Sequence, residues 1–454
     1  MNKCAVILAA GQGKRMKSAG PKAMCRVLLK PMIDWVIDAV RGAGITEICV
    51  VTGCGAEQLR AHLPEDIVTV RQERQLGTGD AVRAAADFIA QQGGSVIVLN
   101  GDAPLIDSET IRDAFEKHAS EGNAATVISA RVDNPYGYGR IAIDHRDGSL
   151  SRIVEEKDAD EQEKGIYEVN SGAFWFDSAD LLRSLEGLRG DNAQGEYYLT
   201  DTVAILRRAG KRAGVYSTAN SSVVLGANDR AQLMELNRIA RRRVFDALLA
   251  EGVDIPCPDG VIIGPDVRIG RDTLILPNTI LSGSTVIGES CTVGPNTRVE
   301  DSKIADGVRL DNVVCERARV RSGADIGPFV HIRPNSDVGE RVHLGNFVEV
   351  KNSTVGEGTK VSHLTYVGDS DVGARVNFGC GCVTVNYDGK AKHRTTIGDN
   401  AFIGCNTNLI APVTVAENAY TAAGSTITED VPAEALGIAR ARQVNKEGWV
   451  RRRK

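Results

Sequence analysis

Hydrophobic positions along the chain follow two different periods. Up to about residue 227, short apolar runs alternate with helix-length segments. From about residue 260 onward, aliphatic residues instead recur at every sixth position. Because the period of the hydrophobic pattern reflects the secondary structure that buries it, this change predicts two domains of different architecture.

The apolar runs of the first part have the length of buried strands. They cover residues 5–9, 48–52, 68–70, 96–99, 125–130 and 173–176, and helix-length segments such as 33–43 and 81–91 lie between several of them. Strands that alternate with helices predict a mostly parallel sheet covered on both faces, an α/β Rossmann-like fold. Ligands of such sheets bind at the carboxyl ends of the strands.

The second part has a hexapeptide repeat. The inward-facing series begins with Ile263, Ile269, Ile275, Leu281, Ile287, Val293 and Val299, and it resumes from Ile326, with an insertion between Thr384 and Ile397. A six-residue period sustained this long predicts a parallel β-helix in which each hexapeptide forms one side of a three-sided coil. Roughly nine coils would fit residues 261–431 on that repeat logic.

A charged amphipathic segment separates the two parts. In residues 229–250, Leu233, Leu236, Ala240, Val244 and Leu248 are spaced by three and four, which predicts one apolar face of a long linker helix. We therefore expect domains at residues 1–227 and 251–454, with the helix over 228–250.

Composition narrows the possible functions. Hydrophobic residues make up 42% and charged residues 25% of the chain, so predominant disorder is excluded. The net charge of -5 disfavours a dedicated nucleic-acid binder. No apolar run approaches the ~20 residues of a membrane span, and no signal peptide is evident, so we expect a cytoplasmic protein. The ten cysteines form no Cys-x-x-Cys pair and are expected to be reduced thiols.

A glycine-rich turn follows the first strand. Gly11, Gly13 and the basic Arg15 precede Met16, which stands where a G-x-G-x-x-G fingerprint needs glycine, and a Walker A motif is absent. Small residues would still let the backbone approach a polyphosphate, with Lys22 neutralising its charge. The alternative is an ordinary tight turn with solvated basic residues.

Polar residues also follow later strands. Asp102 comes just after the strand at 96–99, where a carboxylate can hold a Mg²⁺ ion that bridges substrate phosphates, or can simply cap the next turn. The loop from Gln72 to Gly79 offers an amide and backbone groups that could bind the edge of a base.

Polar residues interrupt the β-helix pattern between residues 333 and 396. His363 follows the inward-facing Val361 by two positions, so we expect it on a corner or outer face. An imidazole with an ordinary pKa of about 6.5 can take a proton from an amine near neutral pH, although a surface histidine without a role is the alternative. The insertion of residues 385–396 must leave the coil, and such excursions from rigid scaffolds often carry function.

Several motifs then occur in a characteristic order. They are Leu-Ala-Ala-Gly-x-Gly-x-Arg-Met at 8–16, Pro-Lys at 21–22, Gln-Leu-Gly-Thr-Gly at 75–79, Asn-Gly-Asp-x-Pro-Leu at 100–105, Gly-Tyr-Gly-Arg-Ile at 137–141, Val-Glu-x-Lys at 154–157 and Gln-Gly-Glu-Tyr-Tyr-Leu-Thr-Asp at 194–201. With the hexapeptide repeats that follow, the whole chain resembles the bacterial bifunctional UDP-N-acetylglucosamine pyrophosphorylase/glucosamine-1-phosphate N-acetyltransferases. The resemblance implies that the first domain is a nucleotidyltransferase and that the β-helix is left-handed.

For the first domain, the resemblance implies transfer of UMP from UTP to a sugar 1-phosphate. Arg15 would stabilise charge on the phosphates, and Asp102 and Asn228 would hold Mg²⁺. The residues that would bind the UDP-sugar are Leu8, Ala9, Ala10, Gly11, Lys22, Gln72, Gly77, Thr78, Asn100, Gly101, Asp102, Gly139, Glu155, Asn170 and Asn228. Asn100 stands where these enzymes commonly have an aromatic residue.

For the β-helix, the resemblance implies acetylation of glucosamine 1-phosphate by acetyl-CoA, with His363 as general base. Arg333, Lys351, Tyr366 and Asn377 would bind the sugar phosphate. The residues that would contact acetyl-CoA are Cys380, Asn386, Tyr387, Cys405, Ala423 and Arg440. Small residues such as Ala or Ser are usual where Cys380 and Cys405 stand. A homotrimer is also implied, and the product would feed peptidoglycan and other envelope polymers.

Two other functions remain open at this point. A nucleotidyltransferase with a single activity could use its β-helix only for oligomerisation or regulation. A non-catalytic sensor of sugar nucleotides would bind ligand without releasing pyrophosphate.

Overall fold

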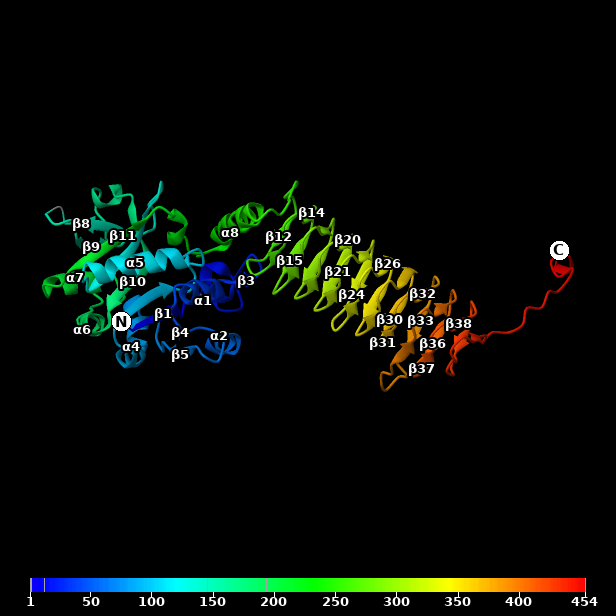
Figure 1. Cartoon of the computed structure of the whole chain (residues 1–454). Coiled ribbons are helices and arrows are strands. Elements are labelled where there is room, and N and C mark those ends of the chain that lie inside the picture. Colours follow the sequence, from blue (N-terminus) through cyan, green and yellow to red (C-terminus); the bar gives the residue numbers. More distant parts are fainter. Residues whose placement is uncertain (1, 12, 145, 193, 454) are drawn as a thin grey trace. The chain divides into compact units, whose positions relative to one another are not determined.

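The structure is a computed structural model that describes residues 2–11, 13–144, 146–192 and 194–453. These residues form two compact units, Met1–Ala240 and Arg241–Lys454 (Figure 1). The helix expected over residues 229–250 is α8 (Arg230–Ala250), and the boundary between the units falls within it.

The first unit is built on a twisted α/β sheet. In spatial order, the sheet contains β11 (Ala213–Thr218), β7 (Ala125–Arg131), β10 (Glu168–Asp177), β6 (Ser95–Asn100), β1 (Lys3–Ala9), β4 (Glu47–Thr52) and β5 (Val68–Arg71). Strand β1 is parallel to both β4 and β6, whereas β10 is antiparallel to β6 and β7. The expected sheet is therefore present, with one reversed strand that the apolar pattern could not reveal. The hairpin of β8 (Arg140–Ile143) and β9 (Leu150–Val154) is attached to β10.

Helices cover both faces of this sheet, as the alternating pattern predicts. On one face, the core includes residues of α1 (Met32–Gly42), α2 (Ala56–His62) and α5 (Ser108–Ser120). On the other, it includes residues of α3 (Thr78–Ala84), α4 (Ala86–Gln92), α6 (Ser178–Glu186) and α7 (Asp201–Arg208). The single helix expected over 81–91 is wrong: the chain turns at Ala85 (φ -96°, ψ 9°), so that α3 and α4 are separate.

The second unit is a parallel β-helix. Within the described residues, its three sheets contain ten, nine and ten strands, in agreement with the expected number of coils. Each strand pairs in parallel with the strand one coil further along, so that Ile263 lies beside Leu281. The aliphatic residues of the six-residue series form one continuous core. Buried threonines at the corners bond to backbone carbonyls, as when Thr279 Oγ1 donates to Leu276 O over 2.7 Å.

Two of the three sheets carry the candidate site residues. The first contains β24 (Val330–Ile332), β27 (Glu349–Lys351), β30 (Tyr366–Gly368) and β33 (Val383–Val385), and the second contains β26 (His343–Asn346), β29 (Lys360–His363), β32 (Asn377–Phe378), β35 (Phe402–Ile403) and β38 (Tyr420–Thr421). The insertion leaves the coil after β33 and returns at β34 (Thr395–Ile397) in the third sheet.

One corner of the β-helix changes character along its length. In the early coils it carries stacked asparagines with positive φ, and Asn278 Nδ2 donates to Asn296 Oδ1 over 3.1 Å. In later coils the corner carries Phe329 (φ 61°), Phe347 (φ 59°) and Leu364 (φ 46°), which are exposed. Bulky side chains are unusual in this backbone region, which glycine and asparagine favour. We call these three residues the corner row.

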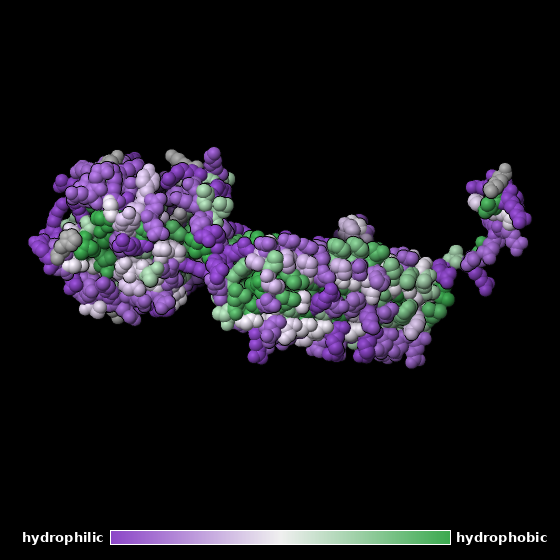
Figure 2. Space-filling view, turned by 90° about the horizontal axis from the view of Figure 1, so that it is seen from above, coloured by the Kyte–Doolittle hydropathy of each residue, from purple (hydrophilic) through white to green (hydrophobic). Residues whose placement is uncertain are grey.

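Hydrophobic surface also gathers along the β-helix in the face seen in Figure 2, whereas the first unit is covered mostly by hydrophilic residues. The rings of Phe329 and Phe347 are stacked, with centroids 5.2 Å apart. Among the described residues, no helix is long and apolar enough to cross a membrane.

Candidate active sites

A cavity of about 380 Å³ opens in the first unit. Its floor is formed by residues at the carboxyl ends of β1 and β6 and at the start of α3. The lining residues are Leu8, Ala9, Ala10, Gly11, Lys22, Ala23, Gln72, Gln75, Gly77, Thr78, Ala81, Asn100, Asp102 and Glu196. Ten of the positions expected to bind a UDP-sugar are thus brought together at the strand ends, where an α/β sheet binds its ligands.

The loop before α3 is held in place by partly buried hydrogen bonds. Gln72 Nε2 donates to Gly77 O over 3.1 Å and to Asp80 Oδ2 over 2.8 Å. Gln75 Nε2 donates to Ala10 O over 3.2 Å, which ties the loop to the glycine-rich turn. Gly77 has a φ of +115°, and a Cβ atom there would lie 2.6 Å from Tyr197 O, so only glycine fits.

Three polar side chains converge at the edge of the cavity. Lys22 Nζ forms an ion pair with Asp102 and donates to Asn228 Oδ1 over 2.8 Å. An ammonium group therefore lies where the two oxygen ligands expected for Mg²⁺ point together. Among the described residues, no group of three or more His, Cys, Asp or Glu side chains could hold a metal ion. One carboxylate and one amide oxygen nevertheless fit Mg²⁺, which usually takes few protein ligands and keeps water or phosphate oxygens.

The residues expected to hold the sugar lie beside this cavity. Asn170 N donates to Gly139 O over 2.8 Å, and a Cβ atom on Gly139 would lie 3.5 Å from Glu155 Oε2. The register of β10 shifts after Asn170, and a bulge of this kind re-aims a side chain at a functional site. Burial raises the pKa of Glu155, although the hydrogen bond from Thr200 Oγ1 over 3.1 Å opposes that shift.

Two other expected residues do not line the cavity. Arg15 is exposed on the 3-10 turn Lys14–Met16. Gly101 is buried, and its backbone N–H donates to Leu8 O over 2.9 Å. Gly101 therefore joins β6 to β1, and its close packing against β1 accounts for glycine there.

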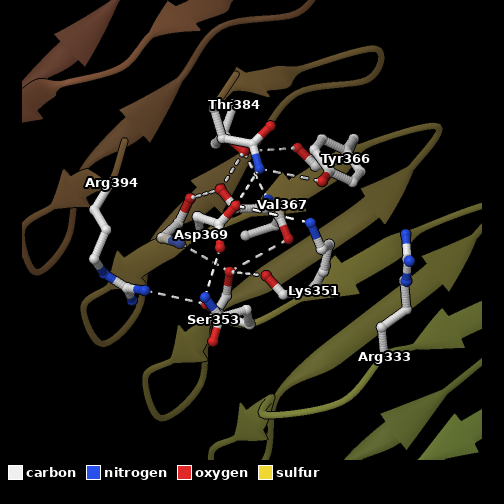
Figure 3. Close-up of polar contacts among 12 residues, drawn as sticks. Arg333, Lys351, Ser353, Tyr366, Val367, Asp369, Thr384 and Arg394 are labelled. Atoms are coloured by element: carbon white, nitrogen blue, oxygen red, sulfur yellow. Dashed lines mark hydrogen bonds and ion pairs between the residues drawn. The ribbon is translucent and has the colours of Figure 1, made fainter. Parts of the chain in front are cut away.

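In the second unit, a polar cluster lies at the carboxyl ends of β24, β27, β30 and β33. Lys351 Nζ lies 3.9 Å from Asp369 Oδ2, and Asn386 Nδ2 donates to Asp369 Oδ2 and, over 3.4 Å, to the Tyr366 hydroxyl. Figure 3 shows Lys351, Tyr366 and Asp369 directed toward one another. Arg333 lies one coil away and donates to Glu349 Oε1 over 2.9 Å. We call Arg333, Lys351, Tyr366, Asp369 and Asn386 the basic cluster.

Charge is concentrated in this cluster. The pKa of Lys351 is lowered, first by its contact with Lys392 in the insertion and then by burial. Burial by itself would raise the pKa of Asp369, but hydrogen bonds from Asn352 and Asn386 and the charge of Lys351 outweigh it, and the pKa is lowered. Two adjacent lysines with one carboxylate leave a net positive site that suits a phosphate group.

The insertion itself is well ordered by local bonds. Tyr387 pairs with Lys392 in an antiparallel bridge. Asp388 accepts hydrogen bonds from the backbone N–H groups of Lys390 and Ala391, which lower its pKa together with His393. The exposed Tyr387 side chain is thereby held out from the coil.

The remaining expected residues form a column along another corner. The register Val361–Phe378–Ile403–Thr421 on β29, β32, β35 and β38 stacks His363, Cys380, Cys405 and Ala423 in successive coils. Arg440 lies against Gly424, the residue after Ala423, because a Cβ atom on Gly424 would lie 3.7 Å from its Cδ. We call these five residues the His363 column. Asn377 lies nearby on β32, in register with Lys360 and Phe402.

The His363 column and the basic cluster occupy different corners of one β-helix. His363 ends β29, whereas Asp369 follows β30. Asp369 lies six positions after His363 along mostly extended chain, so the two are roughly 20 Å apart at most. Tyr366 links the two regions, because its ring lies along β30 and its hydroxyl reaches Asn386.

Comparison with known proteins identifies the family. A model of the MobA-like NTP transferase domain matches residues 5–201, and one of the bacterial transferase hexapeptide (six repeats) matches residues 266–301 and 394–429. The Bifunctional protein GlmU of Clostridium perfringens (strain SM101 / Type A) is 50% identical over 456 residues, covering 100% of both chains. That of Acetivibrio thermocellus is 49% identical over 446 residues, 98% of this chain and 96% of the relative. The Bifunctional protein GlmU of Thermoanaerobacter pseudethanolicus is 50% identical over 448 residues, which cover 99% of this chain and 97% of the relative.

The chain belongs to the GlmU family. The family resemblance and the fold class expected from the sequence are thus confirmed, from the nucleotidyltransferase domain to the left-handed hexapeptide β-helix. Because these GlmU relatives are named bifunctional and match over nearly the whole chain, two activities are favoured over a β-helix that serves only for assembly.

The structure also adds residues to the two GlmU sites that the sequence did not single out. Gln75 and Glu196 line the cavity of the first unit. Asp369 belongs to the basic cluster, and Lys392 of the insertion contacts Lys351 in it. Gln75 and Glu196 each lie within one of the motifs, whereas no periodicity marks Lys392, and only its basic charge in the insertion could have drawn attention to it.

Proposed function

We propose that the chain makes UDP-N-acetylglucosamine in two steps. The β-helix acetylates glucosamine 1-phosphate with acetyl-CoA, and the first unit then transfers UMP from UTP to the product and releases pyrophosphate. The observation that carries the proposal is that one GlmU-family chain holds a cavity at the strand ends of its first unit, and both a His363 column and a basic cluster on two corners of its second. The product is a precursor of cell-wall polymers.

In the first unit, the chain's own groups position two phosphates. The backbone at Gly11 and the Lys22 ammonium line the cavity, where they can face the UTP phosphates. Asp102 and Asn228 would hold Mg²⁺, which would neutralise charge between the two substrates. Lys22 would then leave its two oxygen partners and bind phosphate. The attacking sugar-phosphate oxygen needs no base of its own, so positioning and charge neutralisation suffice.

Arg15 is exposed in the structure. We propose that it closes over the triphosphate when UTP binds, since its turn directly follows the glycine-rich segment. The residues near Glu155 would hold the sugar, and the buried carboxylate would accept a hydrogen bond from a sugar hydroxyl.

In the β-helix, we assign proton transfer to His363. Its exposed imidazole would accept a proton from the 2-amino group as that nitrogen attacks the thioester carbonyl, and the CoA thiol would leave. Arg333, Lys351 and Lys392 would bind the sugar phosphate through charge-assisted hydrogen bonds. Tyr366 and Asn377 would orient the sugar.

The acetyl transfer site requires neighbouring chains. The His363 column and the basic cluster lie on different corners of a single β-helix, whereas adjacent prisms can bring one corner of each together. The exposed corner row runs beside His363 and suits such an interface, because contiguous apolar surface marks association sites. We therefore propose a homotrimer with acetyl-CoA bound between subunits, acting in the cytoplasm where its co-substrates occur.

A coupled assay tests the function. Purified protein is given glucosamine 1-phosphate, acetyl-CoA, UTP and Mg²⁺, and free CoA thiol, pyrophosphate and UDP-N-acetylglucosamine are measured separately. We expect all three products, with pyrophosphate dependent on prior acetylation. Pyrophosphate from N-acetylglucosamine 1-phosphate without any acetyl-CoA-dependent thiol release would instead support a single-activity nucleotidyltransferase.

A substitution tests whether Asp102 binds the metal or only supports folding. Asp102→Ala should abolish Mg²⁺-dependent UDP-sugar formation and leave acetyl transfer intact, because it removes the only carboxylate of the expected metal site. Asp66→Ala, which removes an exposed ion pair with Arg41, is the matched control and should keep both activities. Near-normal UDP-sugar formation by Asp102→Ala in saturating Mg²⁺ would remove Asp102 from this role.

A further inference from the structure

Three cysteines lie close together in two adjacent coils. Cys380 and Cys382 flank Gly381 after β32, and Cys405 follows β35. The parallel pairing of Phe378 with Ile403 sets Cys380 beside Cys405. Two backbone hydrogen bonds bracket this pair: Gly379 N donates to Ile403 O over 2.7 Å, and Asn406 N donates to Cys380 O over 2.8 Å. The register of the two cysteines is therefore fixed by the coil.

The geometry of the pair permits a disulfide bond. Adjacent strands lie about 4.8 Å apart, within the range of Cα separations that a disulfide spans. The sulfur of Cys405 also leans toward the neighbouring coil, because a Cβ atom on Gly379 would lie only 2.9 Å from Cys405 Sγ. Cys380 is half-buried and Cys405 is exposed, so both can be reached from solvent.

The third cysteine has a different environment. Cys382 is buried and donates to Gly379 O over 3.0 Å and to Gly404 O over 3.1 Å. Burial, and then the charges of Cys405 and Cys380, raise its pKa to about 11. Cys382 therefore stays a protonated thiol inside the coil. Within the described residues these cysteines belong to no group that could hold a metal ion, which leaves thiol chemistry for the outer pair.

An imidazole lies on the other side of Cys380. The pairing of Val361 with Phe378 stacks His363 beside Cys380, and Gly381 N donates to His363 O over 3.4 Å. An imidazole can accept the proton of a thiol as the sulfur attacks. Cys380 thus has a proton acceptor in the preceding coil and a second thiol in the following coil.

We propose that Cys380 and Cys405 are a modification site that reacts with the disulfide of coenzyme A and closes to a Cys380–Cys405 disulfide. The choice of coenzyme A rests on the proposed function, in which both residues face acetyl-CoA. Closure joins two coils through the middle of the His363 column, where the acyl donor would lie. Oxidation therefore blocks acetyl transfer and spares the uridylyl reaction of the first unit.

The reaction proceeds by two exchanges of thiol and disulfide. The Cys380 thiolate attacks one sulfur of the CoA disulfide, so that a Cys380–CoA bond forms, the CoA–CoA bond breaks and one CoA thiolate leaves. The Cys405 thiolate then attacks the Cys380 sulfur and releases the second CoA thiolate. Two cysteine thiols are oxidised, one CoA disulfide is reduced to two CoA thiols, and the two cysteine protons pass to the departing thiolates.

The test uses the reduced full-length protein with CoA disulfide as oxidant. Thiols are counted after denaturation, linked peptides are identified by mass spectrometry, and both activities are measured before and after treatment. We expect two thiols fewer than the ten of the reduced chain, a Cys380–Cys405 linked peptide and at least a tenfold loss of acetyl transfer. Uridylyl transfer should be unchanged, and dithiothreitol should restore acetyl transfer. Glutathione disulfide at the same concentration should react at least tenfold more slowly.

Two variants make the result decisive, each compared with its own reduced form. Cys405→Ser should stop at the first exchange and keep one CoA per chain, whereas Cys54→Ser, which alters an exposed cysteine of the first unit, should behave like the wild type. A linked peptide that involves other cysteines, no CoA adduct on Cys405→Ser, or full acetyl transfer by the oxidised protein would each overturn the proposal. Equal rates with glutathione disulfide would overturn coenzyme A as the specific reactant.

The same experiment distinguishes a failure of the proposed modification site from a failure of the proposed acetyltransferase function. If the reduced protein transfers no acetyl group but CoA disulfide still links Cys380 to Cys405, the modification site stands and the acetyltransferase assignment fails. If acetyl transfer is present and the thiols stay unreacted, the reverse holds.

Discussion

At the scale of single residues, the ammonium group of Lys22 lies between the Asp102 carboxylate and the Asn228 amide. Without a cation, two converging oxygens would repel each other and move apart. Lys22 holds them in the arrangement that a divalent ion needs. In the basic cluster the positive charge is in excess, because Lys351 and Lys392 face each other and the single carboxylate of Asp369 neutralises them only in part.

The proposed base is tested by removing its ring. His363→Ala should lower acetyl transfer by about 10²–10⁴ and leave uridylyl transfer unchanged, because a general base typically contributes that much. His343→Ala is the matched control: this histidine lies earlier in the same sheet, and its ring forms a hydrogen bond with Asp325 over 3.2 Å, outside the expected site. A loss below tenfold in His363→Ala would show that the proton leaves by another route.

The lowered pKa of Asp369 predicts a dependence of stability on pH. Because its pKa is lower in the folded chain than in the unfolded chain, its ionised form stabilises the β-helix at neutral pH. That stabilisation is lost as the pH falls from the ordinary value of about 4 through the folded-state pKa. Asp369→Asn should therefore lower the unfolding free energy of the β-helix at pH 7 by about 1–3 kcal/mol, measured as a lower Tm, and the difference from the wild type should shrink in acid.

The control for this measurement is Asp272→Asn, at an exposed corner with positive φ that asparagine adopts readily. Its melting curves should follow the wild type at every pH. A difference between Asp369→Asn and the wild type that stays constant down to pH 3 would show that ionisation of Asp369 is not its source.

At the scale of elements, strands and helices could be read from the sequence wherever a period was present. Six strands of the α/β sheet, the helix α8 and the hexapeptide register follow from the spacing of apolar residues. The strands β8, β9 and β11 were not expected, and β10 begins at Glu168, five residues before the expected run at 173–176. The reversed direction of β10 could not be predicted, because a run of apolar residues does not show whether its strand is parallel or antiparallel to its neighbours. The break at Ala85 was missed for a similar reason: alanine favours a helix, and only packing of the flanking segments ends it.

The candidate sites could be predicted only in part. Most residues that line the cavity could be predicted from motifs at strand ends, since the fold fixes where those ends meet. Lys392 and Asp369 interact across a loop and a coil, and such long-range contacts leave no local pattern. The separation of His363 from the basic cluster was also not evident, because six residues in sequence can span one full face of the prism.

The loop before α3 gives a prediction for an element. Gly77→Ala should displace the start of α3 and raise the KM for UTP at least tenfold, because the new Cβ atom would meet Tyr197 O at 2.6 Å. The strain should also destabilise the first unit by about 1–3 kcal/mol, measured by thermal unfolding.

Gly93→Ala is the matched control for this change. Gly93 also has a positive φ, of +61°, but a Cβ atom there meets nothing within 4 Å. Gly93→Ala should lose stability only because alanine is strained at positive φ, and it should keep the wild-type KM for UTP. Similar KM values for the two variants would argue against a role of the Gly77 loop in binding UTP.

At the scale of the whole molecule, the proposed trimer makes a prediction about its corner row. Phe347→Asp should disperse the assembly in analytical ultracentrifugation, because it places a charge in an apolar contact. Acetyl transfer should fall at least tenfold with the assembly, whereas uridylyl transfer should stay within twofold of the wild type.

The control is Val286→Asp, at an exposed apolar position on the third sheet of the β-helix. It should leave both sedimentation and activity unchanged. A Phe347→Asp protein that stays trimeric, or that dissociates and keeps acetyl transfer, would contradict a site shared between chains.

Because each coil of the described β-helix pairs in parallel with the coil before it and the coil after it, the β-helix consists of similar divisions along its axis, one per coil. Deleting one complete division between residues 268 and 303, where no expected site residue occurs, would shorten it by about 4.8 Å and leave the later divisions in their own register. The length of the β-helix before the expected site residues can thus be altered without changing those residues.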